Sequence, residues 1–441
     1  MMNRIAKGVS LLFVSGILAS ILIQDYTEVL PLGLFNTERG PYVQLANACL
    51  IVISAIFLVL TAEALWGASW RMAGIFRGGL FLVLLTELLL GGVDRFLVSQ
   101  NPLSSLGGLY YEKRTARGTS VILEKPHAGS TLGFRTDHPY KPVPDHYRIL
   151  FLGDSYTEGS GRSRDCNYPN VVEHVLRSRR GDIEVMNAGV AGYGPVDALN
   201  LLRFLREEGY RFDALLYNLF TENDFTDNLP ETDRHVVGGV IFRFPHSWFL
   251  RTFHPLNSYL FRYALVLWRV GTLSTEERKQ FSREAGPCVF SEEPYREISP
   301  LLGELIRQRL AGSQRVVRSR VAQQAFIGAV QAMKAEADKM GIPFLIVVFP
   351  DRVIADSEIQ TRLNIGPDQL DPINSLHALV YQAAPNVPII EVADTLRGRS
   401  GMYRVGDTHL SDLGNKIAGE YVGDKLVGLL ATMHLEKTSQ R

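Results

Sequence analysis

Four short polar blocks carry the residues best suited to chemistry in this 441-residue chain. They are GDSYTEG at 153–159, NAGVAG at 187–192, TEND at 221–224 and GDTH at 406–409. The first three blocks each follow a predicted strand, and in an open α/β sheet the active site lies beyond the carboxyl ends of the strands. We therefore expect the blocks to meet at one edge of such a sheet.

Ser155 is the candidate nucleophile, because a serine at a tight turn from strand to helix projects its hydroxyl at the edge of the sheet. Serine attacks a carbonyl only when a base removes its proton, and a histidine held by a carboxylate provides that base. His409 is the candidate base, and Asp407, two residues before it, is the candidate carboxylate. This set predicts acyl-transfer chemistry through a covalent intermediate on Ser155.

Other chemistries have less support in the residue pattern. Gly189, Gly192 and Gly194 lack the G-x-G-x-x-G spacing of a nucleotide loop, and G-x-x-x-x-G-K-[ST] is absent. No cluster of His, Cys, Asp and Glu has metal-ligand spacing and H-E-x-x-H is missing, so neither a metal nor another cofactor is predicted. The 46 Lys and Arg balance the 46 Asp and Glu to a net charge of +0, so no nucleic-acid partner is predicted.

The elements that must position these residues alternate between β-rich runs and helical patterns from residue 147 onwards. The predicted strands cover 148–152, 183–186, 214–219, 344–349 and 387–391. The predicted helices cover 168–179, 195–208, 316–340, 372–383 and 412–432. This alternation is typical of a parallel sheet covered by helices on both faces. The predicted fold class is therefore α/β, a three-layer α/β/α domain with a parallel five-stranded sheet.

The first 98 residues are predicted to be a membrane anchor. Three stretches, at about 8–24, 41–63 and 78–96, are apolar over the length that a helix needs to cross a bilayer, although the third contains the costly Glu87. Lys and Arg are more frequent in the N-terminal tail and between the second and third spans than between the first two spans, which places the tail inside and everything after residue 98 outside. This predicts a multi-pass protein of the cytoplasmic (inner) membrane with an extracytoplasmic catalytic domain. If the third segment does not cross, the catalytic domain lies in the cytoplasm instead.

The domain organisation predicted from these features has four parts. They are the transmembrane anchor at 1–98, a linker and lead-in at 99–146, the catalytic domain at 147–432 and a C-terminal tail at 433–441. Residues 230–315 are an insertion in the catalytic domain, far longer than a usual connection between strand and helix. The aromatic segment 246–270 inside this insertion could cover an active site, rest on a bilayer or form a satellite core.

Cysteine usage is consistent with either side of a membrane. Cys49 falls in the second predicted span, which leaves Cys166 and Cys288 for the remainder of the chain. These two form either a single disulfide or two unpaired buried thiols, and the sequence leaves both alternatives open.

Together the four blocks resemble those of the SGNH (GDSL-type) hydrolase superfamily, in the family's order and over residues 147 to about 425. The run ILFLGDSYTEG is the most specific, and STLGFR at 130–135 resembles the lead-in of membrane-anchored bacterial members. The resemblance implies a flavodoxin-like fold. It also implies an oxyanion hole formed by the backbone N–H groups of Ser155 and Gly192 and the side-chain amide of Asn223. Asp154 and Asp224 would hydrogen-bond the loops that hold these groups.

Two departures from the family pattern concern the site. The family's last block is Asp-x-x-His, whereas this chain has Asp-Thr-His with Asp407 as the carboxylate. If Asp407 points elsewhere, Ser155 and His409 would act as a dyad. The third block has Thr-Glu-Asn-Asp in place of Gly-x-Asn-Asp, which keeps Asn223 but places bulkier atoms beside the oxyanion site.

The function predicted from these residues and this resemblance is a membrane-anchored serine ester hydrolase. Its expected partners are the membrane and acyl esters of a glycan or lipid, with O-acyl groups of cell-envelope glycans as the leading substrate class. An alternative uses the same residues for O-acyl transfer to a polysaccharide with a multi-span membrane acyltransferase partner. A further alternative is a non-catalytic glycan-binding scaffold, against which an intact Ser155, Asn223 and His409 count.

Overall fold

The computed structural model describes part of the chain. The described residues are 71–94, 110–115, 119–124, 146–159, 164–221, 223–227, 232–237, 240–245, 258–260, 263–264, 288, 290, 300–404 and 408–439. The chain forms two compact units, which are described separately. Unit 1 comprises Met1–Gly108 with Asp233–Thr272, and unit 2 comprises Leu109–Thr232 with Leu273–Arg441.

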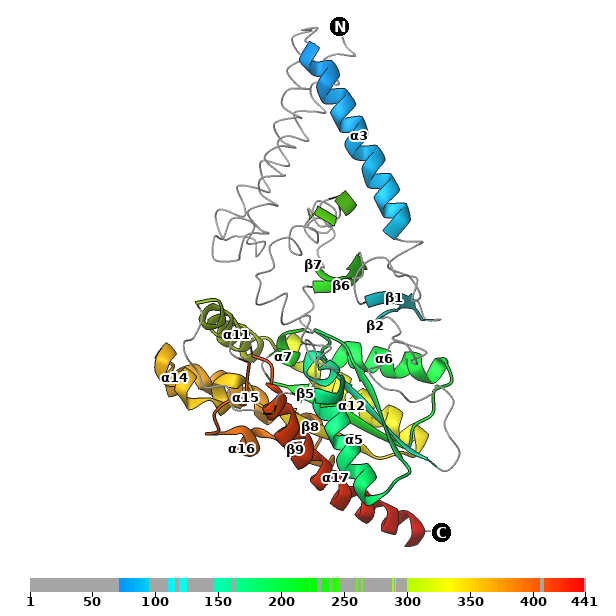
Figure 1. The fold of residues 1–441 in the computed structure, drawn as a ribbon, viewed down its shortest axis with the longest axis vertical. Helices are drawn as coiled ribbons and strands as arrows, with labels where there is room; N and C mark the ends of the chain where they lie inside the picture. The colour runs from blue at the N-terminus through cyan, green and yellow to red at the C-terminus, as the bar shows by residue number, and fades with distance from the viewer. Residues whose placement is uncertain are drawn as a thin grey trace. The chain divides into compact units, whose positions relative to one another are not determined.

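The centre of unit 2 is a five-stranded parallel sheet (Figure 1). Its strands are β3 (Tyr147–Gly153), β4 (Ile183–Gly189), β5 (Ala214–Phe220), β8 (Phe344–Phe349) and β9 (Ile389–Glu391). Their order across the sheet is β4-β3-β5-β8-β9, the 2-1-3-4-5 order of flavodoxin-like folds. All five predicted strands are present, with ends that differ from the predicted ones by at most three residues.

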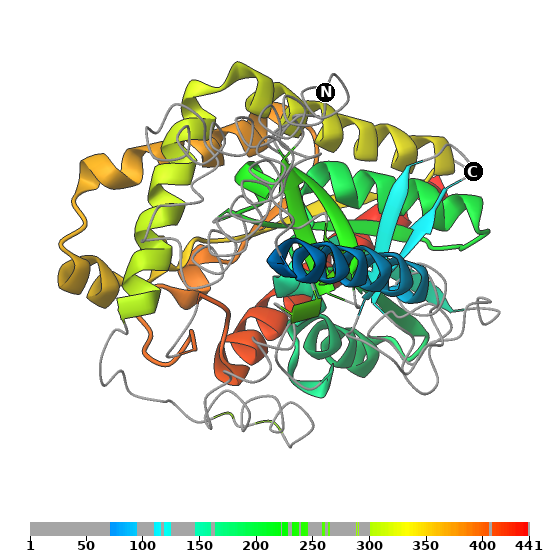
Figure 2. The same ribbon diagram turned by 90° about the horizontal axis from the view of Figure 1, so that it is seen from above.

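Helices cover both faces of this sheet (Figures 1 and 2). On one face α5 (Tyr168–Arg179) packs against α17 (Asp412–Ser439), and on the other α6 (Pro195–Glu207) packs against α12 (Arg320–Met340). Ile149 and Phe151 of β3 belong to the core beneath α5 and α17. Because successive side chains of a strand point to opposite faces, Leu150 and Leu152 point towards the second helical layer.

The α5–α17 pair packs closely because α17 has glycines where the two helices meet. A Cβ added to Gly419 would lie 2.6 Å from Val171 Cβ, and one added to Gly423 would lie 2.8 Å from Val175 Cβ. Larger residues at these positions would force the helices apart. The spacing of four residues keeps both contacts on one face of each helix.

One predicted helix is in fact two. The expected helix at 316–340 begins at Arg320, because Ser319 has extended backbone angles and its side chain accepts a hydrogen bond from Ala322 N. This N-cap separates α12 from α11 (Pro300–Arg318), which continues the chain in the N-terminal direction. Unit 2 also contains the helices α4 (Ser155–Glu158), η3 (Arg164–Cys166), α7 (Asp224–Asp227), α13 (Arg352–Ala355), α14 (Ser357–Leu363), α15 (Pro367–Ala383) and α16 (Ala393–Leu396).

Two hairpins lie outside the central sheet. β1 (Tyr110–Arg114) and β2 (Ser120–Glu124) form an antiparallel pair in unit 2, and β6 (Thr232–Val237) pairs with β7 (Val240–Pro245). The first hairpin lies in the stretch 99–146, for which the sequence patterns predicted no strands. Tyr111, Val121 and Leu123 are almost fully buried, so this hairpin contributes to the core of unit 2.

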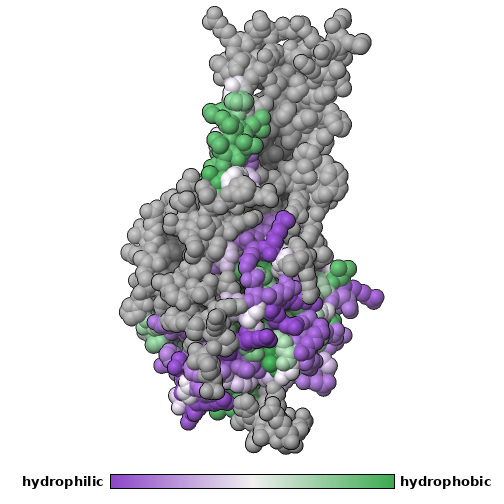
Figure 3. Space-filling model, turned by 90° about the vertical axis from the view of Figure 1, so that its right-hand side faces the viewer, coloured by the Kyte–Doolittle hydropathy of each residue, from purple (hydrophilic) through white to green (hydrophobic). Residues whose placement is uncertain are grey.

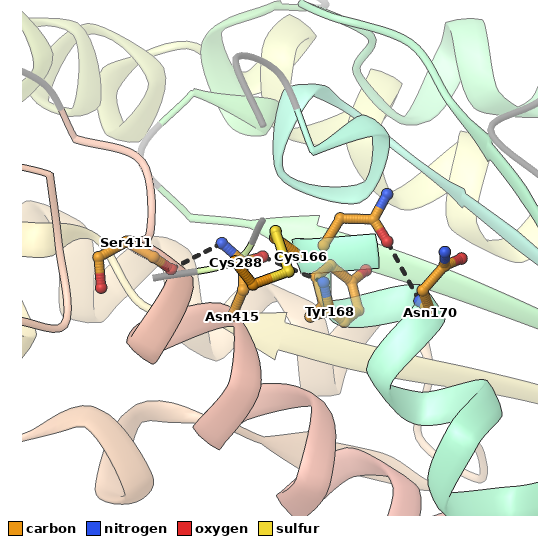
Figure 4. The surroundings of a disulfide bond; sticks show 7 residues. Cys166, Tyr168, Asn170, Cys288, Ser411 and Asn415 are labelled. Atoms are coloured by element: carbon orange, nitrogen blue, oxygen red, sulfur yellow. Dashed lines mark hydrogen bonds between the residues drawn. A yellow bond between two sulfur atoms is a disulfide. The ribbon is translucent and has the colours of Figure 1, made fainter. Parts of the chain in front are cut away.

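A disulfide joins Cys166 of η3 to Cys288, at the far end of the insertion (Figure 4). The structure thereby decides between the two alternatives for these cysteines. Next to it, Asn415 of α17 accepts a hydrogen bond from Tyr168 N over 3.1 Å. Lys416 Nζ lies 5.0 Å from the centre of the Phe290 ring. The disulfide and the Lys416 contact fasten Cys288 and Phe290 to the start of the α5–α17 layer.

Removing this disulfide is expected to lower the free energy of unfolding by about 2 to 5 kcal/mol, because it closes a loop across a sequence separation of 122 residues. The measurement is urea denaturation of the full chain, without reductant, for a Cys166→Ser and Cys288→Ser double variant. Cys49→Ser is the matched control and should leave the midpoint unchanged. Equal midpoints for the double variant and the wild type would contradict the stabilising role of the disulfide.

In unit 1 the structure corrects the predicted membrane anchor. Among the described residues, no helix combines the length and apolar character needed to cross a membrane. This finding overturns the three-span part of the predicted fold class and the predicted multi-pass location in the inner membrane. The third predicted span corresponds to α3 (Arg71–Val93). The predicted spans at 8–24 and 41–63 lie outside the described residues.

The physical reason for this correction is visible in α3. Arg71, Arg77 and Glu87 interrupt its apolar sequence. Glu87 accepts hydrogen bonds from Ser258 Oγ and Leu260 N, each over 3.0 Å, and from the N–H of the intervening Tyr259. The carboxylate thus has polar partners within unit 1. Several apolar side chains of the same helix are exposed and form a green surface in Figure 3: Phe81, Leu82, Val83, Leu84, Leu85, Leu88, Leu89 and Val93.

Candidate active site

Ser155 is the first residue of α4, directly after the tight turn that ends β3. Asp154 caps this helix by accepting a hydrogen bond from Tyr156 N over 2.9 Å. A Cβ at Gly153 would lie 2.1 Å from Thr157 Oγ1, so only glycine fits where the strand turns into the helix. The turn therefore places Ser155 at the carboxyl edge of the sheet, as the sequence predicted.

The fold brings His409 to Ser155 across 254 positions of sequence, with His409 Nε2 lying 2.8 Å from Ser155 Oγ. This is the distance at which an imidazole can take the hydroxyl proton. Asp407, the predicted orienting carboxylate, lies outside the described residues.

Tyr156, which follows the nucleophile, contacts both Thr408 and His409. Its hydroxyl donates a hydrogen bond to the Thr408 carbonyl, and its ring stacks on the His409 ring with centroids 5.4 Å apart. The Tyr156 ring also stacks on Phe220 of β5, with centroids 3.8 Å apart. Because all these groups are buried or partly buried, Tyr156 restricts where the imidazole can lie.

The base of the same loop is closed by a short antiparallel pairing. Tyr403 and Leu410 form an isolated β-bridge, and Arg404 N donates to the His409 carbonyl over 2.9 Å. The fully buried Arg352 of α13 donates from Nη1 to the Arg404 carbonyl over 2.7 Å. Sequence reasoning missed Arg352, although its position just after a predicted strand was a signal of the kind used for the other blocks.

Gly192 lies in the turn that follows β4. Its φ of +73° is in the left-handed region, which favours glycine. The turn is joined to the nucleophile's strand, because Val190 N donates to the Gly153 carbonyl over 3.1 Å. At its start, a Cβ on Gly189 would lie 2.2 Å from Glu158 N, so the end of β4 and the end of α4 are in direct contact.

Asn223 follows β5 and is buried. Its Nδ2 donates to Asp227 Oδ2 over 2.6 Å. An amide nitrogen carries two N–H groups, so the bond to Asp227 orients Asn223 without using its full donor capacity. Asp227 was not predicted, and its position four residues after Asn223, one helical turn away, was the available signal.

Three buried carboxyl groups therefore lie close to the nucleophile: Asp154, Asp224 and Asp227. Burial raises the pKa of Asp154 to about 6, against the lowering effects of Tyr156 N–H and His409. Burial also raises the pKa of Asp224 well above its ordinary value, and the negative charge of Asp154 raises it further. Asp224 accepts hydrogen bonds from Phe220 N and Tyr217 OH, which fits the structural role expected for it.

Asp351 is a further buried carboxyl group at this edge of the sheet that sequence reasoning did not single out. It follows β8, its backbone N–H donates to Thr221 Oγ1 over 2.8 Å, and its Oδ1 caps α13 through Val353 N. Its Oδ2 has no hydrogen-bond partner among the residues that the structure describes. Burial raises the pKa of Asp351 to about 6, although the Val353 N–H and Arg309 act in the opposite direction.

The raised pKa of Asp351 gives the stability a pH dependence that Asp351→Asn should remove. A carboxyl group with a raised pKa in the folded state stabilises it below about pH 4, and this contribution is lost as the pH rises through about 6. Between pH 4 and pH 7 the unfolding free energy of the variant should therefore improve relative to wild type by up to about 3 kcal/mol. Urea denaturation at both pH values measures this. The exposed Asp394→Asn is the control, and a pH-independent difference for Asp351→Asn would contradict the assignment.

Metal chemistry has no candidate ligand group in this part of the chain. Across the described residues, no three or more His, Cys, Asp or Glu side chains are arranged to hold a metal ion. The carboxyl groups around Ser155 are instead engaged with backbone and side-chain donors, as set out above.

Comparisons with known proteins give remote structural likenesses only. No protein-family model and no curated protein matches the chain. Among solved structures, a protein assigned to the lipolytic G-D-S-L family of Desulfitobacterium hafniense is 12% identical over 63% of this chain and 99% of that chain, with a TM-score of 0.34. The psychrotrophic esterase EstA of Pseudoalteromonas sp. is 12% identical over 64% and 98%, with a TM-score of 0.33.

Another solved structure similar to this chain is Est24, a carbohydrate acetylesterase of Sinorhizobium meliloti. It is 13% identical over 64% of this chain and 99% of that chain, with a TM-score of 0.31. All three relatives are ester-cleaving or lipolytic proteins by description. The likenesses are too remote to assign a function, which has to be inferred from Ser155, His409 and their neighbours.

Proposed function

We propose that this protein is a serine ester hydrolase that works through an acyl-enzyme on Ser155. The observation that carries the proposal is the 2.8 Å contact between Ser155 Oγ and His409 Nε2, made at the carboxyl edge of a parallel sheet. A serine that begins a helix and meets an imidazole nitrogen has both the exposed hydroxyl and the base that nucleophilic catalysis requires.

The reaction begins when His409 Nε2 takes the Ser155 proton as Oγ attacks the ester carbonyl. The tetrahedral oxyanion then accepts hydrogen bonds from Ser155 N–H, Gly192 N–H and Asn223 Nδ2. Collapse of this intermediate breaks the bond to the alcohol, which leaves with the proton from His409. Water, activated by the same imidazole, attacks the acyl-enzyme and releases the acid. Asp407 holds the imidazole and stabilises its protonated form.

The substrate class we propose is a small acyl ester, with O-acetyl groups on a glycan as the leading example. The Tyr156 ring stacks on Phe220 and on His409, and Thr221 is buried and accepts a hydrogen bond from Asp351 N. On this basis we propose that the space for the acyl group is shallow at the end of β5. The resemblance of the four sequence blocks to SGNH hydrolases supports ester hydrolysis in general.

The experiment that tests the proposal is intact mass of the full chain after exposure to a fluorophosphonate. The wild type should gain one adduct, and Ser155→Ala should gain none. Ser178→Ala is the matched control, because Ser178 is an exposed serine of α5 whose hydroxyl bonds only to its own helix in the structure. Adduct formation by Ser155→Ala, or its absence in folded wild type, would refute the nucleophile and favour a non-catalytic scaffold.

Turnover measurements then separate hydrolysis from transfer. We expect release of p-nitrophenol from p-nitrophenyl acetate in buffer alone, and slower release from the octanoate. A requirement for an added polysaccharide would show that a sugar hydroxyl, rather than water, resolves the acyl-enzyme. That outcome would overturn hydrolysis while leaving Ser155 as the nucleophile.

A further inference from the structure

The β1–β2 hairpin contacts both loops that carry the proposed backbone donors of the oxyanion hole. One donor is the N–H of Ser155 in α4 and the other is the N–H of Gly192 in the turn after β4. Each of these two segments is joined to the hairpin by hydrogen bonds of a tyrosine hydroxyl group. The hairpin itself is part of the buried core of unit 2 through Tyr111, Val121 and Leu123.

The first contact fixes the Gly192 turn. Tyr193, the next residue, accepts a hydrogen bond from Ile122 N over 2.7 Å and donates one to the Ile122 carbonyl over 2.6 Å. Both residues are buried, and the Tyr193 hydroxyl uses its donor and an acceptor site on one backbone unit of β2. The hydroxyl therefore has one well-defined position, which limits how the adjoining peptide of Gly192 can rotate.

The second contact fixes α4. Tyr110 of β1 donates from its hydroxyl to Glu158 Oε1 over 2.6 Å, and Glu158 is the last residue of the helix that Ser155 begins. Glu158 is almost fully buried, and its backbone lies against Gly189 at the end of β4. A buried carboxylate without its partner is costly, so the bond from Tyr110 holds the end of this short helix in place.

We propose that the β1–β2 hairpin is a positioning element that sets the Ser155 and Gly192 N–H groups relative to each other. This inference rests on the serine hydrolase function proposed above. Oxyanion donors are effective only when they are preorganised, and removal of one such donor costs about 10² to 10³ in rate in a comparable enzyme. Tyr110 and Tyr193 are thus positioning residues, which act on the oxyanion through the two backbone donors.

The test compares Tyr193→Phe and Tyr110→Phe with Lys113→Ala. Lys113 belongs to the same hairpin, but its side chain bonds to Glu208 and lies over the Phe204 ring, on the side of α6. We expect each tyrosine variant to lower kcat for p-nitrophenyl acetate by about tenfold with KM unchanged. A displaced donor stabilises the transition state less well, whereas the substrate complex depends on it much less. Lys113→Ala should retain the wild-type kcat.

Affinity for a trifluoromethyl ketone provides a readout that a merely structural role would not change. This inhibitor forms a tetrahedral adduct with an oxyanion, so its inhibition constant should rise by the same factor as kcat falls in the tyrosine variants. Equal kcat and inhibition constants in Tyr193→Phe, Tyr110→Phe and Lys113→Ala would overturn the positioning role. If one tyrosine variant fails to fold, the other still tests the proposal. An inactive, unlabelled wild type would instead refute the hydrolase function itself.

Discussion

Ser155→Ala and His409→Ala are each expected to lower kcat for acetyl ester hydrolysis by about 10⁵- to 10⁶-fold, and the double variant should be no slower than either. Nucleophile and base act as one unit, because the hydroxyl is unreactive without the imidazole and the imidazole has no nucleophile to activate without the hydroxyl. The 2.8 Å contact between Ser155 Oγ and His409 Nε2 is the structural basis for this non-additivity.

The measurement is a set of kcat values for the wild type, both single variants and the double variant, with active-site titration to exclude traces of wild type. His377→Ala is the matched control. His377 of α15 also forms a hydrogen bond to a side-chain oxygen, but its partner is Glu391 of β9 and not Ser155. It should retain the wild-type kcat. If the fold-decrease in kcat of the double variant equalled the product of the two single decreases, Ser155 and His409 would act independently. That result would contradict the proposed pair.

Asn223 is expected to contribute less than this pair and more than the hairpin tyrosines. Its amide is one of three proposed donors, so the other two remain when it is removed. The order of effects, with Ser155 and His409 first, Asn223 next and Tyr110 and Tyr193 last, follows from how directly each residue meets the reacting atoms.

The central sheet could be predicted from the sequence because its strands are buried on both faces. Such strands appear as short continuous apolar runs, and β8, for example, has the sequence FLIVVF between Pro343 and Pro350. The polar blocks stood at the ends of these runs, so Ser155, Gly192 and Asn223 were found with the strands. No local pattern links Ser155 to His409, so their contact was expected only from the chemistry of the four blocks together and from the resemblance.

The β1–β2 hairpin and the supporting residues could not be predicted in the same way. YYEKR and SVILE are five-residue strands without a clear alternation, and they lie in a stretch with no repeating α/β pattern. Their burial depends on tertiary contacts such as Tyr193 with Ile122. Arg352 and Asp227 stood at positions that offered a signal, but that signal alone does not distinguish a buried charged side chain from an exposed one.

The membrane prediction failed for a reason specific to α3. A count of apolar residues treats Glu87 as one unfavourable position in an otherwise apolar segment. In the structure this carboxylate accepts three hydrogen bonds from residues 258–260, which are distant in sequence and belong to the same unit. Hydropathy alone contains no information about such partners.

Asp407→Asn is expected to lower kcat by about 10⁴-fold, because an asparagine favours the wrong tautomer of the imidazole and cannot stabilise its protonated form. The Asp-Thr-His spacing makes this prediction specific to the chain. The loop on either side is well anchored, since Arg352 donates to the Arg404 carbonyl and Tyr156 donates to the Thr408 carbonyl.

The same substitution in a His409→Ala background provides the control, because a carboxylate that acts only through the imidazole has no effect once the imidazole is gone. We therefore expect Asp407→Asn to change kcat there by less than about twofold. A loss in both backgrounds would indicate that Asp407 stabilises the loop rather than the imidazole. A nearly normal rate for Asp407→Asn in the enzyme that retains His409 would show that Ser155 and His409 act as a dyad. The Tyr156 ring and the hydrogen bond to the Thr408 carbonyl would then orient the imidazole.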